Sequence, residues 1–247
     1  MSRTHVKMLL ICALVLLIAA LSQRHTLPRP DLLVESLRQE PEQVQVQHAP
    51  LTTTVGGVTY RIDPLYSYDL HGLVVSRHDS SSWTDYVHRE WNDHLNVVDL
   101  CVIWGRNAIS GSYRDLDFSS GQFVCYVQSA SHTAAAAFDV AALSNNHLLT
   151  DDPALARQLR SVRVGDQIRF RGYLAEYAHN HGGRPFQRGT STVRTDTGNG
   201  ACETVYVNAV EILRRGGGPW RVMVWVAAAL LALGIVAWFR LPLSESS

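Results

Sequence analysis

The chain has 247 residues, and its 22 basic and 22 acidic side chains give a formal net charge of zero. About 190 residues lie between an apolar segment near each end, enough for one domain with a sizeable core, although two small domains would also fit. The sequence contains no nucleotide-binding loop, zinc-protease motif, GxSxG nucleophile elbow or haem-attachment pair. It therefore excludes the common enzyme classes that these motifs identify.

The first apolar segment, Met8 to Leu21, follows a short head that contains the basic residues Arg3 and Lys7. Its length of about 14 residues is less than the roughly 20 of a typical membrane-crossing helix and suits the apolar region of a secretory signal. Residues 1–22 are therefore predicted to be either a cleaved signal peptide or a retained signal anchor. Both alternatives export the residues that follow.

The second apolar segment, Val222 to Phe239, carries no charge and has a tryptophan near each end, where indole rings prefer the membrane interface. We predict a transmembrane helix over residues 220–240. Three arginines, Arg214, Arg215 and Arg221, precede the apolar segment. Taken alone they would keep the middle of the chain in the cytosol, but the first segment usually sets the orientation. We therefore expect residues 23–218 outside the cytosol, with the protein held in the bacterial inner membrane.

Residues 23–58 are rich in Pro, Gln and Glu and are predicted to form a tether, and residues 59–215 to form a soluble β-rich domain. Alternation of apolar and polar residues from Tyr60 predicts a strand, or a bent pair of strands, split at Pro64. Gly172 interrupts another alternating strand and predicts a bulge there. The further predicted strands cover residues 97–104, 123–127, 190–194 and 202–213.

Two helices are predicted within this domain. Ser82 and Asp85 have the spacing of a capping box. The apolar residues that follow at intervals of four are Trp83, Val87, Trp91 and Leu95. The second helix begins at Asp152 and Pro153, an acid at the cap followed by proline in the first turn, and it ends at Val162.

These patterns predict a mainly β fold of the α+β class. We expect an antiparallel sheet or a partly open barrel, with one or two packed helices, flanked by two membrane helices. A Gly-Asp pair at residues 165–166 leads into the alternating strand that Gly172 interrupts. This pattern is typical of small barrels of the oligonucleotide-binding (OB) type, so an OB-like barrel is predicted.

Three cysteines lie in the soluble part, Cys101, Cys125 and Cys202, and each is in an apolar or β-branched stretch. They have neither CxxC nor zinc-binding spacing. In an oxidising compartment one pair can form a disulfide and leave the third residue as a buried thiol, and burial of all three as thiols is equally compatible with the sequence.

Four segments of the soluble part are informative when their order and spacing are taken together. They are DLCVIWG at 99–105, SNNHLL at 144–149, VGDQIRFRGYL at 164–174 and TSTVRTDTGNGACE at 190–203. In this arrangement the chain resembles a group of bacterial envelope proteins that carry a signal or an anchor at the amino terminus. The resemblance implies an envelope location. It implies no activity and no catalytic residue, because none is established for that group.

The most polar breaks in this apolar pattern contain Asn146, His147, Arg194, Asp196 and Glu203. Turn formation alone explains Asp196, and the asparagine and histidine can simply shape the approach to the second helix. Our hypothesis is that all five residues converge on one shallow site. There the arginine, held between two carboxylates, would grip a planar anion with two hydrogen bonds.

The residues His88, Glu90, Asp93 and His94 have metal-ligating side chains. On a helix, however, His88 and His94 are six residues apart and point in different directions, so no metal site is predicted. We also predict no cofactor.

Two functions remain open. The favoured one is a non-catalytic binding or assembly module that is exported, tethered to the membrane and bound to an envelope protein partner. The alternative is an envelope hydrolase that uses His147 with Asp196 or Glu203 as an acid–base pair. Binding of single-stranded nucleic acid by an OB-like barrel is a weaker alternative, because export opposes it.

Overall fold

The computed structural model describes residues 2–193, 196 and 202–241 of the chain. The chain divides into two compact units, one formed by Leu27–Arg215 and the other by Met1–Thr26 together with Gly216–Ser247. The first unit is rich in β-strands and the second consists mainly of two helices. The predicted mainly β fold with few helices and a terminal apolar helix at each end is confirmed.

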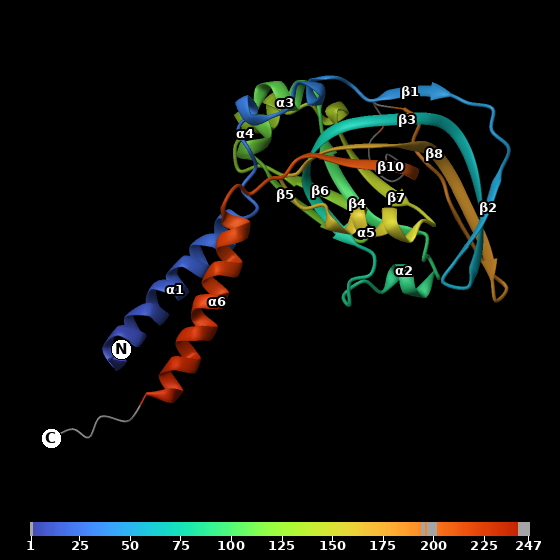
Figure 1. The fold of residues 1–247 in the computed structure, drawn as a ribbon. Coiled ribbons are helices and arrows are strands. Elements are labelled where there is room, and N and C mark those ends of the chain that lie inside the picture. Colours follow the sequence, from blue (N-terminus) through green and yellow to red (C-terminus); the bar gives the residue numbers. More distant parts are fainter. Residues whose placement is uncertain (1, 194–195, 197–201, 242–247) are drawn as a thin grey trace. The chain divides into compact units, whose positions relative to one another are not determined.

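The β-rich unit is built around a ring of five paired strands (Figure 1). Pairing runs from β3 to β4, β7, β10 and β8, and β8 pairs again with β3, which closes the ring. All of these pairs are antiparallel except β7 with β10, which is parallel. The five strands are β3 (Val58–Asp79), β4 (Asn96–Ile103), β7 (Leu143–Leu149), β8 (Gln167–His181) and β10 (Glu203–Arg214).

Strand β3 is continuous through Pro64, where the sequence left one bent strand or two strands open. The register with β8 shifts between Pro64 and Tyr66, and such an irregularity tolerates a residue that lacks an N–H. At Gly72 a Cβ atom would lie 2.2 Å from Cγ1 of Val102. Glycine is therefore needed where β3 passes from its partner β8 to its partner β4.

The pairing of β8 with β10 has a bulge at the predicted glycine. Gly172 pairs with Val207 and the preceding residue, Arg171, pairs with Ala209, so Asn208 is the extra residue of β10. A Cβ atom on Gly172 would lie 2.1 Å from the carbonyl oxygen of Tyr206. Close approach of the two backbones explains the glycine.

The core of the ring contains alternate residues of all five strands and the apolar face of helix α5 (Pro153–Ser161). Asp152 caps this helix, because its side chain accepts hydrogen bonds from the backbone N–H groups of Ala154 and Leu155. The second predicted helix is thus present. Its Leu155 and Leu159 are buried against the barrel.

The predicted helix from Ser82 to Leu95 was wrong, because only α2 (Val87–Glu90) forms. The side chain of Asp85 bonds to the rings of His78 and His88 and accepts a hydrogen bond from the backbone N–H of His88. It therefore does not form the capping box. Trp83, expected on the apolar face, is 86% exposed. Tertiary hydrogen bonds have replaced the regular helix.

The predicted strand over residues 190–194 is also absent from Thr190–Val193, the part of it that the structure describes. There the hydroxyl of Ser191 accepts a hydrogen bond from the N–H of Val193 and donates to a carboxylate oxygen of Asp196. Side-chain bonding to the local backbone has taken the place of strand pairing.

The segment expected as a tether, residues 23–58, contains regular structure that belongs to the β-rich unit from residue 27 onward. Its strands β1 (Glu42–Gln45) and β2 (Leu51–Val55) both pair with β3. Before them come two short 3-10 turns, η1 (Pro30–Leu32) and η2 (Glu35–Arg38). Leu37 of the second turn is completely buried.

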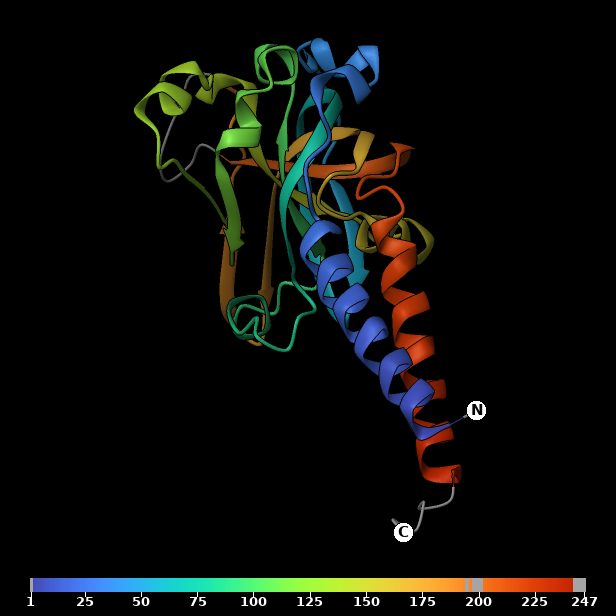
Figure 2. The same ribbon diagram turned by 90° about the vertical axis from the view of Figure 1, so that its left-hand side faces the viewer.

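An insertion between β4 and β7 folds over the outside of the ring. It contains α3 (Gly105–Ser110), η3 (Ser112–Asp115), β5 (Asp117–Gly121), β6 (Val124–Gln128), α4 (His132–Ala137) and η4 (Val140–Ala142). Within the β-rich unit, α3 and α4 lie together at one end and α2 lies at the other (Figures 1 and 2). The remaining strand, β9 (Arg184–Arg188), forms a hairpin with β8.

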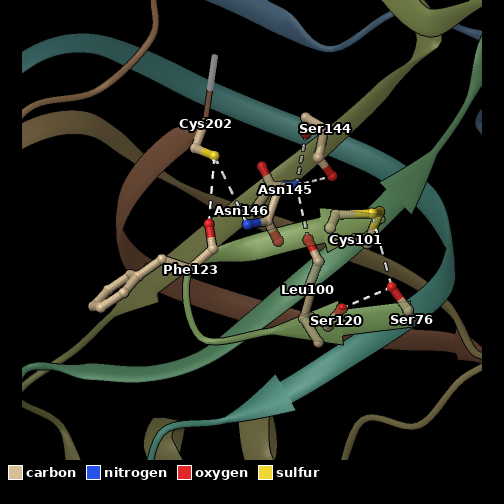
Figure 3. Close-up of a disulfide and its surroundings, with 10 residues drawn as sticks. Ser76, Leu100, Cys101, Ser120, Phe123, Ser144, Asn145, Asn146 and Cys202 are labelled. Carbon is tan, nitrogen blue, oxygen red and sulfur yellow. Dashed lines mark hydrogen bonds between the residues drawn. A yellow bond between two sulfur atoms is a disulfide. The ribbon is translucent and has the colours of Figure 1, made fainter. Parts of the chain in front are cut away.

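A disulfide between Cys101 of β4 and Cys125 of β6 ties the β5–β6 hairpin to the barrel (Figure 3). The hydroxyl of Ser76 adds a hydrogen bond of 2.7 Å to that of Ser120 on the same hairpin. This resolves the cysteine pairing that the sequence left open. Cys202 is a free thiol.

The second unit pairs helix α1 (Arg3–Gln23) with helix α6 (Trp220–Arg240). Both are long and apolar enough to cross a membrane. The guanidinium of Arg3 lies over the ring of Trp238 and donates to the carbonyl oxygen of Leu241.

Replacement of Phe170 with Ala tests the barrel core. Phe170 is completely buried beside Tyr68, so the substitution should lower the free energy of unfolding by about 3–5 kcal/mol, the usual range for a truncated core aromatic. Urea denaturation of the full chain in detergent, followed by near-UV circular dichroism, measures this change. Its exposed neighbour Arg171 supplies the control, for which Arg171→Ala should change stability by less than about 0.5 kcal/mol. Equal effects of the two substitutions would contradict the assignment of Phe170 to the core.

Candidate ligand-binding site

A pocket of about 980 Å3 lies over one end of β7, between the β5–β6 turn and the end of β9. Its wall includes side chains from the loop after β3, from the β5–β6 turn, from β7, from β9 and from the segment that leads to β10. The residues on which its chemistry depends are Trp91, Phe123, Asn145, Arg188, Asp196 and Cys202.

The strands beneath the pocket present polar side chains outward. Leu100 and Leu148 face the barrel core, so their neighbours Asp99 on β4 and His147 on β7 face the opposite side of the sheet. Asp99 and His147 are direct partners in the register of the two strands. Both side chains are fully buried beneath the insertion.

The Asp99 carboxylate is the centre of this group. It accepts hydrogen bonds from Nδ1 of His147 at 2.7 Å, from Nδ2 of Asn96 at 2.9 Å and from the backbone N–H of Phe123 at 3.1 Å. The Nε2 atom of His147 lies 2.6 Å from Nη2 of Arg188. Because a guanidinium can only donate, Nε2 accepts and the ring hydrogen is on Nδ1.

Burial and charge act together on this pair. Burial alone would disfavour the charged form of Asp99, but the attraction of His147 and the hydrogen bonds from His147 and Asn96 prevail, and the pKa is lowered to about 2. The pKa of His147 is lowered from its usual 6.5, first because the ring is buried and also because Arg188 is adjacent. The pair is therefore a carboxylate and a neutral imidazole at neutral pH.

The hydrogen bonds continue from Asn96 toward the surface. The second N–H of Asn96 points at Nε2 of His88 at 2.9 Å, which leaves the hydrogen of that ring on Nδ1. This Nδ1 donates to Oδ2 of Asp85 at 2.6 Å, and the same oxygen contacts Nε2 of His78 at 2.7 Å. One connected chain thus runs from His78 to Arg188.

The turn between β5 and β6 closes over this chain. Phe123 has a left-handed backbone with φ of 62°, and its ring stacks on His88 with centroids 4.1 Å apart. The guanidinium carbon of Arg188 lies 4.0 Å from the centre of the same ring. The side chain of Gln122 accepts hydrogen bonds from the backbone N–H groups of Tyr86 and Val87. These contacts fix the turn as one wall of the pocket.

Asn145 and Cys202 form another part of the wall (Figure 3). The Nδ2 atom of Asn145 lies 3.8 Å from Sγ of Cys202, and this sulfur lies 3.9 Å from the carbonyl oxygen of Phe123. Among the described residues no group bonds to Oδ1 of Asn145, although this residue is only 5% exposed. Burial raises the pKa of the Cys202 thiol, which keeps it protonated.

Of the five residues predicted to converge, the four that the structure describes are distributed over two faces. Asn146 and Glu203 are partners in register, and each lies two residues before a core residue of its strand, Leu148 and Val205, so both face the barrel interior. There the amide of Asn146 donates to Ser144 and to the carbonyl oxygen of Leu100.

The remaining predicted residues belong to the other face or lie outside the described part. His147 lies beneath the pocket, and Asp196 lines it. Arg194 lies outside the described residues. The structure therefore brings Asp196 together with Asn145 and Arg188.

Several residues of the site were missed in the sequence. The clearest overlooked signal is Asp99, a carboxylate in the apolar run VVDLCVIW, because a charged residue in a buried strand requires partners. Arg188 and Phe123 gave no such signal, since their roles depend on contacts with residues distant in sequence.

One group in the described part of the chain has the arrangement of metal ligands, namely His78, Asp85 and His88. Of the four residues considered as metal ligands in the sequence, only His88 belongs to this group. Glu90 is on the surface near Arg184. Asp93 accepts a hydrogen bond from the hydroxyl of Tyr177, and burial raises the pKa of this carboxyl.

Comparison of the chain with protein-family models, with curated proteins and with solved structures found no match. Function is therefore inferred from the geometry of the site.

The lowered pKa values of His147 and Asp99 predict that acid destabilises the fold in two steps. The folded pKa of His147 is below 6.5, so the unfolded chain takes up this proton first and stability falls as the pH drops below about 6.5. The contribution of Asp99, whose pKa is lowered from 3.8 to about 2, is present above pH 4 and is lost as the pH falls further.

Replacement of His147 with Gln should remove the first step. The free energy of unfolding should then fall less steeply from pH 6.5 to 5, a difference of up to about 1.4 kcal/mol per pH unit. Urea denaturation across this range measures the slope, with exposed His132→Gln as the control. A slope equal to that of the unmodified protein would show that His147 does not carry the effect.

Proposed function

We propose that this protein is a non-catalytic binding module of the bacterial envelope, tethered to the membrane, with an anionic ligand or partner group in the pocket beside Arg188. The observation that carries the proposal is that one pocket contains both a cation without an ion pair and an amide oxygen without a hydrogen-bond partner among the described residues. Arg188 and Asn145 supply these two groups.

The charge of Arg188 is not neutralised by a carboxylate of the described residues, since its polar contact is with the neutral ring of His147. Arg188 is half-buried, and its guanidinium carbon lies 4.0 Å from the centre of the Phe123 ring, a contact that restricts its position. A fixed, planar donor set favours carboxylate and phosphate groups, which accept two parallel hydrogen bonds. Asn145 adds an acceptor, so a ligand that carries both an anionic group and a donor fits best.

The position of the pocket agrees with this role. The five-stranded ring, with α5 between its third and fourth strands, is similar to the OB barrel, whose second and third strands and adjoining loops bind oligonucleotides and oligosaccharides. The pocket wall includes residues of β7, which is third in chain order among the five strands of the ring. Nucleic acid is disfavoured, because such sites use a basic groove along the strand, whereas here the wall combines Arg188 with the carboxylate of Asp196.

A hydrolase based on His147 has less support. Both ring nitrogens of His147 are occupied, by Asp99 and by Arg188, and the ring is fully buried. Neither nitrogen is free to exchange a proton with a substrate. The protonated thiol of Cys202 is likewise a poor nucleophile.

Export to the non-cytoplasmic side of the inner membrane is part of the proposal. The basic head before the first apolar segment supports this orientation. The Cys101–Cys125 disulfide adds support, since such bonds persist in oxidising compartments. A domain held at both ends by apolar helices suits a module that presents its pocket to an envelope protein partner.

Anion binding should depend on Arg188. The probes are inorganic phosphate and citrate, added to the full chain in detergent while its melting temperature is measured. At least one should stabilise the unmodified protein, because a ligand that binds only the folded state raises its stability. Arg188→Gln should weaken that binding roughly tenfold or more, as expected for loss of a hydrogen bond to a charged group.

The matched control is Arg184→Gln, at the exposed start of the same strand, which should respond as the unmodified protein does. Native mass spectrometry of the protein after mild extraction identifies any small molecule that it retains. Equal stabilisation of the Arg188 variant by either anion would place the binding elsewhere. A lack of response of the unmodified protein to both anions, with no retained anion, would contradict the proposal.

The orientation is tested with reporters fused after Arg215. A reporter that is active only after export should be active at this point, and one that is active only in the cytosol should be silent. The reverse pattern would place the β-rich unit in the cytosol, where the arginines before α6 would keep it.

A further inference from the structure

We propose that His78, Asp85 and His88 form a binding site for a divalent transition-metal ion of the zinc type. One nitrogen from each imidazole and one carboxylate oxygen lie within 4.8 Å of one another. The oxygen Oδ2 of Asp85 is 2.7 Å from Nε2 of His78 and 2.6 Å from Nδ1 of His88. This proposal is independent of the function proposed for the pocket.

The backbone holds the three ligands in place. His78 is near the end of β3, opposite Asp99 in the register with β4. Asp85 is fixed by its second oxygen, which accepts the backbone N–H of His88 at 3.0 Å. The ring of His88 is stacked against Phe123. The ligand set therefore does not need a large rearrangement to assemble.

The charge of Asp85 supports a cation at this point. Its side chain is fully buried, and the groups that the structure places on its oxygens are two imidazoles and one backbone N–H. No arginine or lysine of the described residues forms an ion pair with it. A buried carboxylate is stable when it is paired or bound to a metal, and a divalent ion would supply the missing positive charge.

The donor set also defines the class of metal. Two imidazole nitrogens and one carboxylate oxygen are the ligands of zinc sites that keep a position open for water. Zinc bonds these atoms at about 2.0–2.2 Å, so ligand atoms around a tetrahedral ion stand roughly 3.3 Å apart. The present contacts must open by about 0.6 Å, which small rotations of the two rings provide. His78 is at the surface edge of the site with 13% of its side chain exposed, which gives the ion a route of entry.

Asn96 lies behind the ring of His88 and has to adjust when an ion binds. When Nδ1 of His88 binds an ion, the ring hydrogen moves to Nε2, which faces the amide of Asn96. The amide oxygen of Asn96 is buried and has no hydrogen-bond partner among the described residues. Metal binding therefore requires the Asn96 side chain to move, because its Nδ2 also donates to Asp99 and a half-turn of the amide would place its oxygen against that carboxylate.

Metal analysis of the full chain tests the proposal. The protein carries a tag without histidine, is extracted in detergent, stripped with a chelator and dialysed against zinc or cobalt. We expect one equivalent of zinc by mass spectrometry of the metal, and visible absorption bands of tetrahedral cobalt. His78→Gln should weaken zinc binding at least tenfold and abolish the cobalt bands.

His94→Gln is the matched control, since His94 is exposed in the same loop and outside the cluster, and it should bind as the unmodified protein does. Asp85→Asn is a second variant, and near-UV circular dichroism establishes that each variant is folded. If Asp85→Asn fails to fold, His78→Gln alone decides the outcome. Absence of bound metal in the unmodified protein, or unchanged binding by folded His78→Gln, would overturn the proposal.

Discussion

The buried carboxylate of Asp99 is the constraint on which the site depends. It joins β4 to β7 through His147 and to the β5–β6 turn through the N–H of Phe123, and Asn96 at the start of β4 connects it to His88 in the loop after β3. Three separate parts of the chain are thus fixed by one side chain that cannot be left without partners. The hydrogen bonds that satisfy this carboxylate also hold the β5–β6 turn, which forms one wall of the pocket.

This arrangement also explains why the turn and the arginine are held in fixed positions. The Phe123 ring lies between His88 and Arg188, so the same residue covers the buried polar chain and orients the cation that faces the pocket. A stable polar network needs every donor and acceptor to be satisfied. Among the described residues the amide oxygens of Asn96 and Asn145 have no hydrogen-bond partner, and Asn145 lines the pocket in which an anionic ligand is inferred.

Local patterns were enough to predict the elements that local interactions determine. The Asp152-Pro153 start of α5 and the irregularity at Gly172 follow from capping and from close backbone approach, which involve neighbouring residues or the adjacent strand. The helix from Ser82 failed because the Asp85 side chain bonds to His78, which belongs to a different element. The site was predicted only in part for the same reason. Strand alternation separates His147 from Asn146, and no local pattern indicated that Arg188 would reach across from β9.

The disulfide gives the protein a maturation step. It closes a loop with a sequence separation of 24 residues, which removes chain entropy from the unfolded state and contributes about 3 kcal/mol. While the thiols are reduced, the hairpin that carries Phe123 is attached to the barrel only by non-covalent contacts, of which the Ser76–Ser120 bond is one. Oxidation therefore completes the pocket wall after synthesis, so the time and place at which the site becomes fully formed depend on the redox state around the chain.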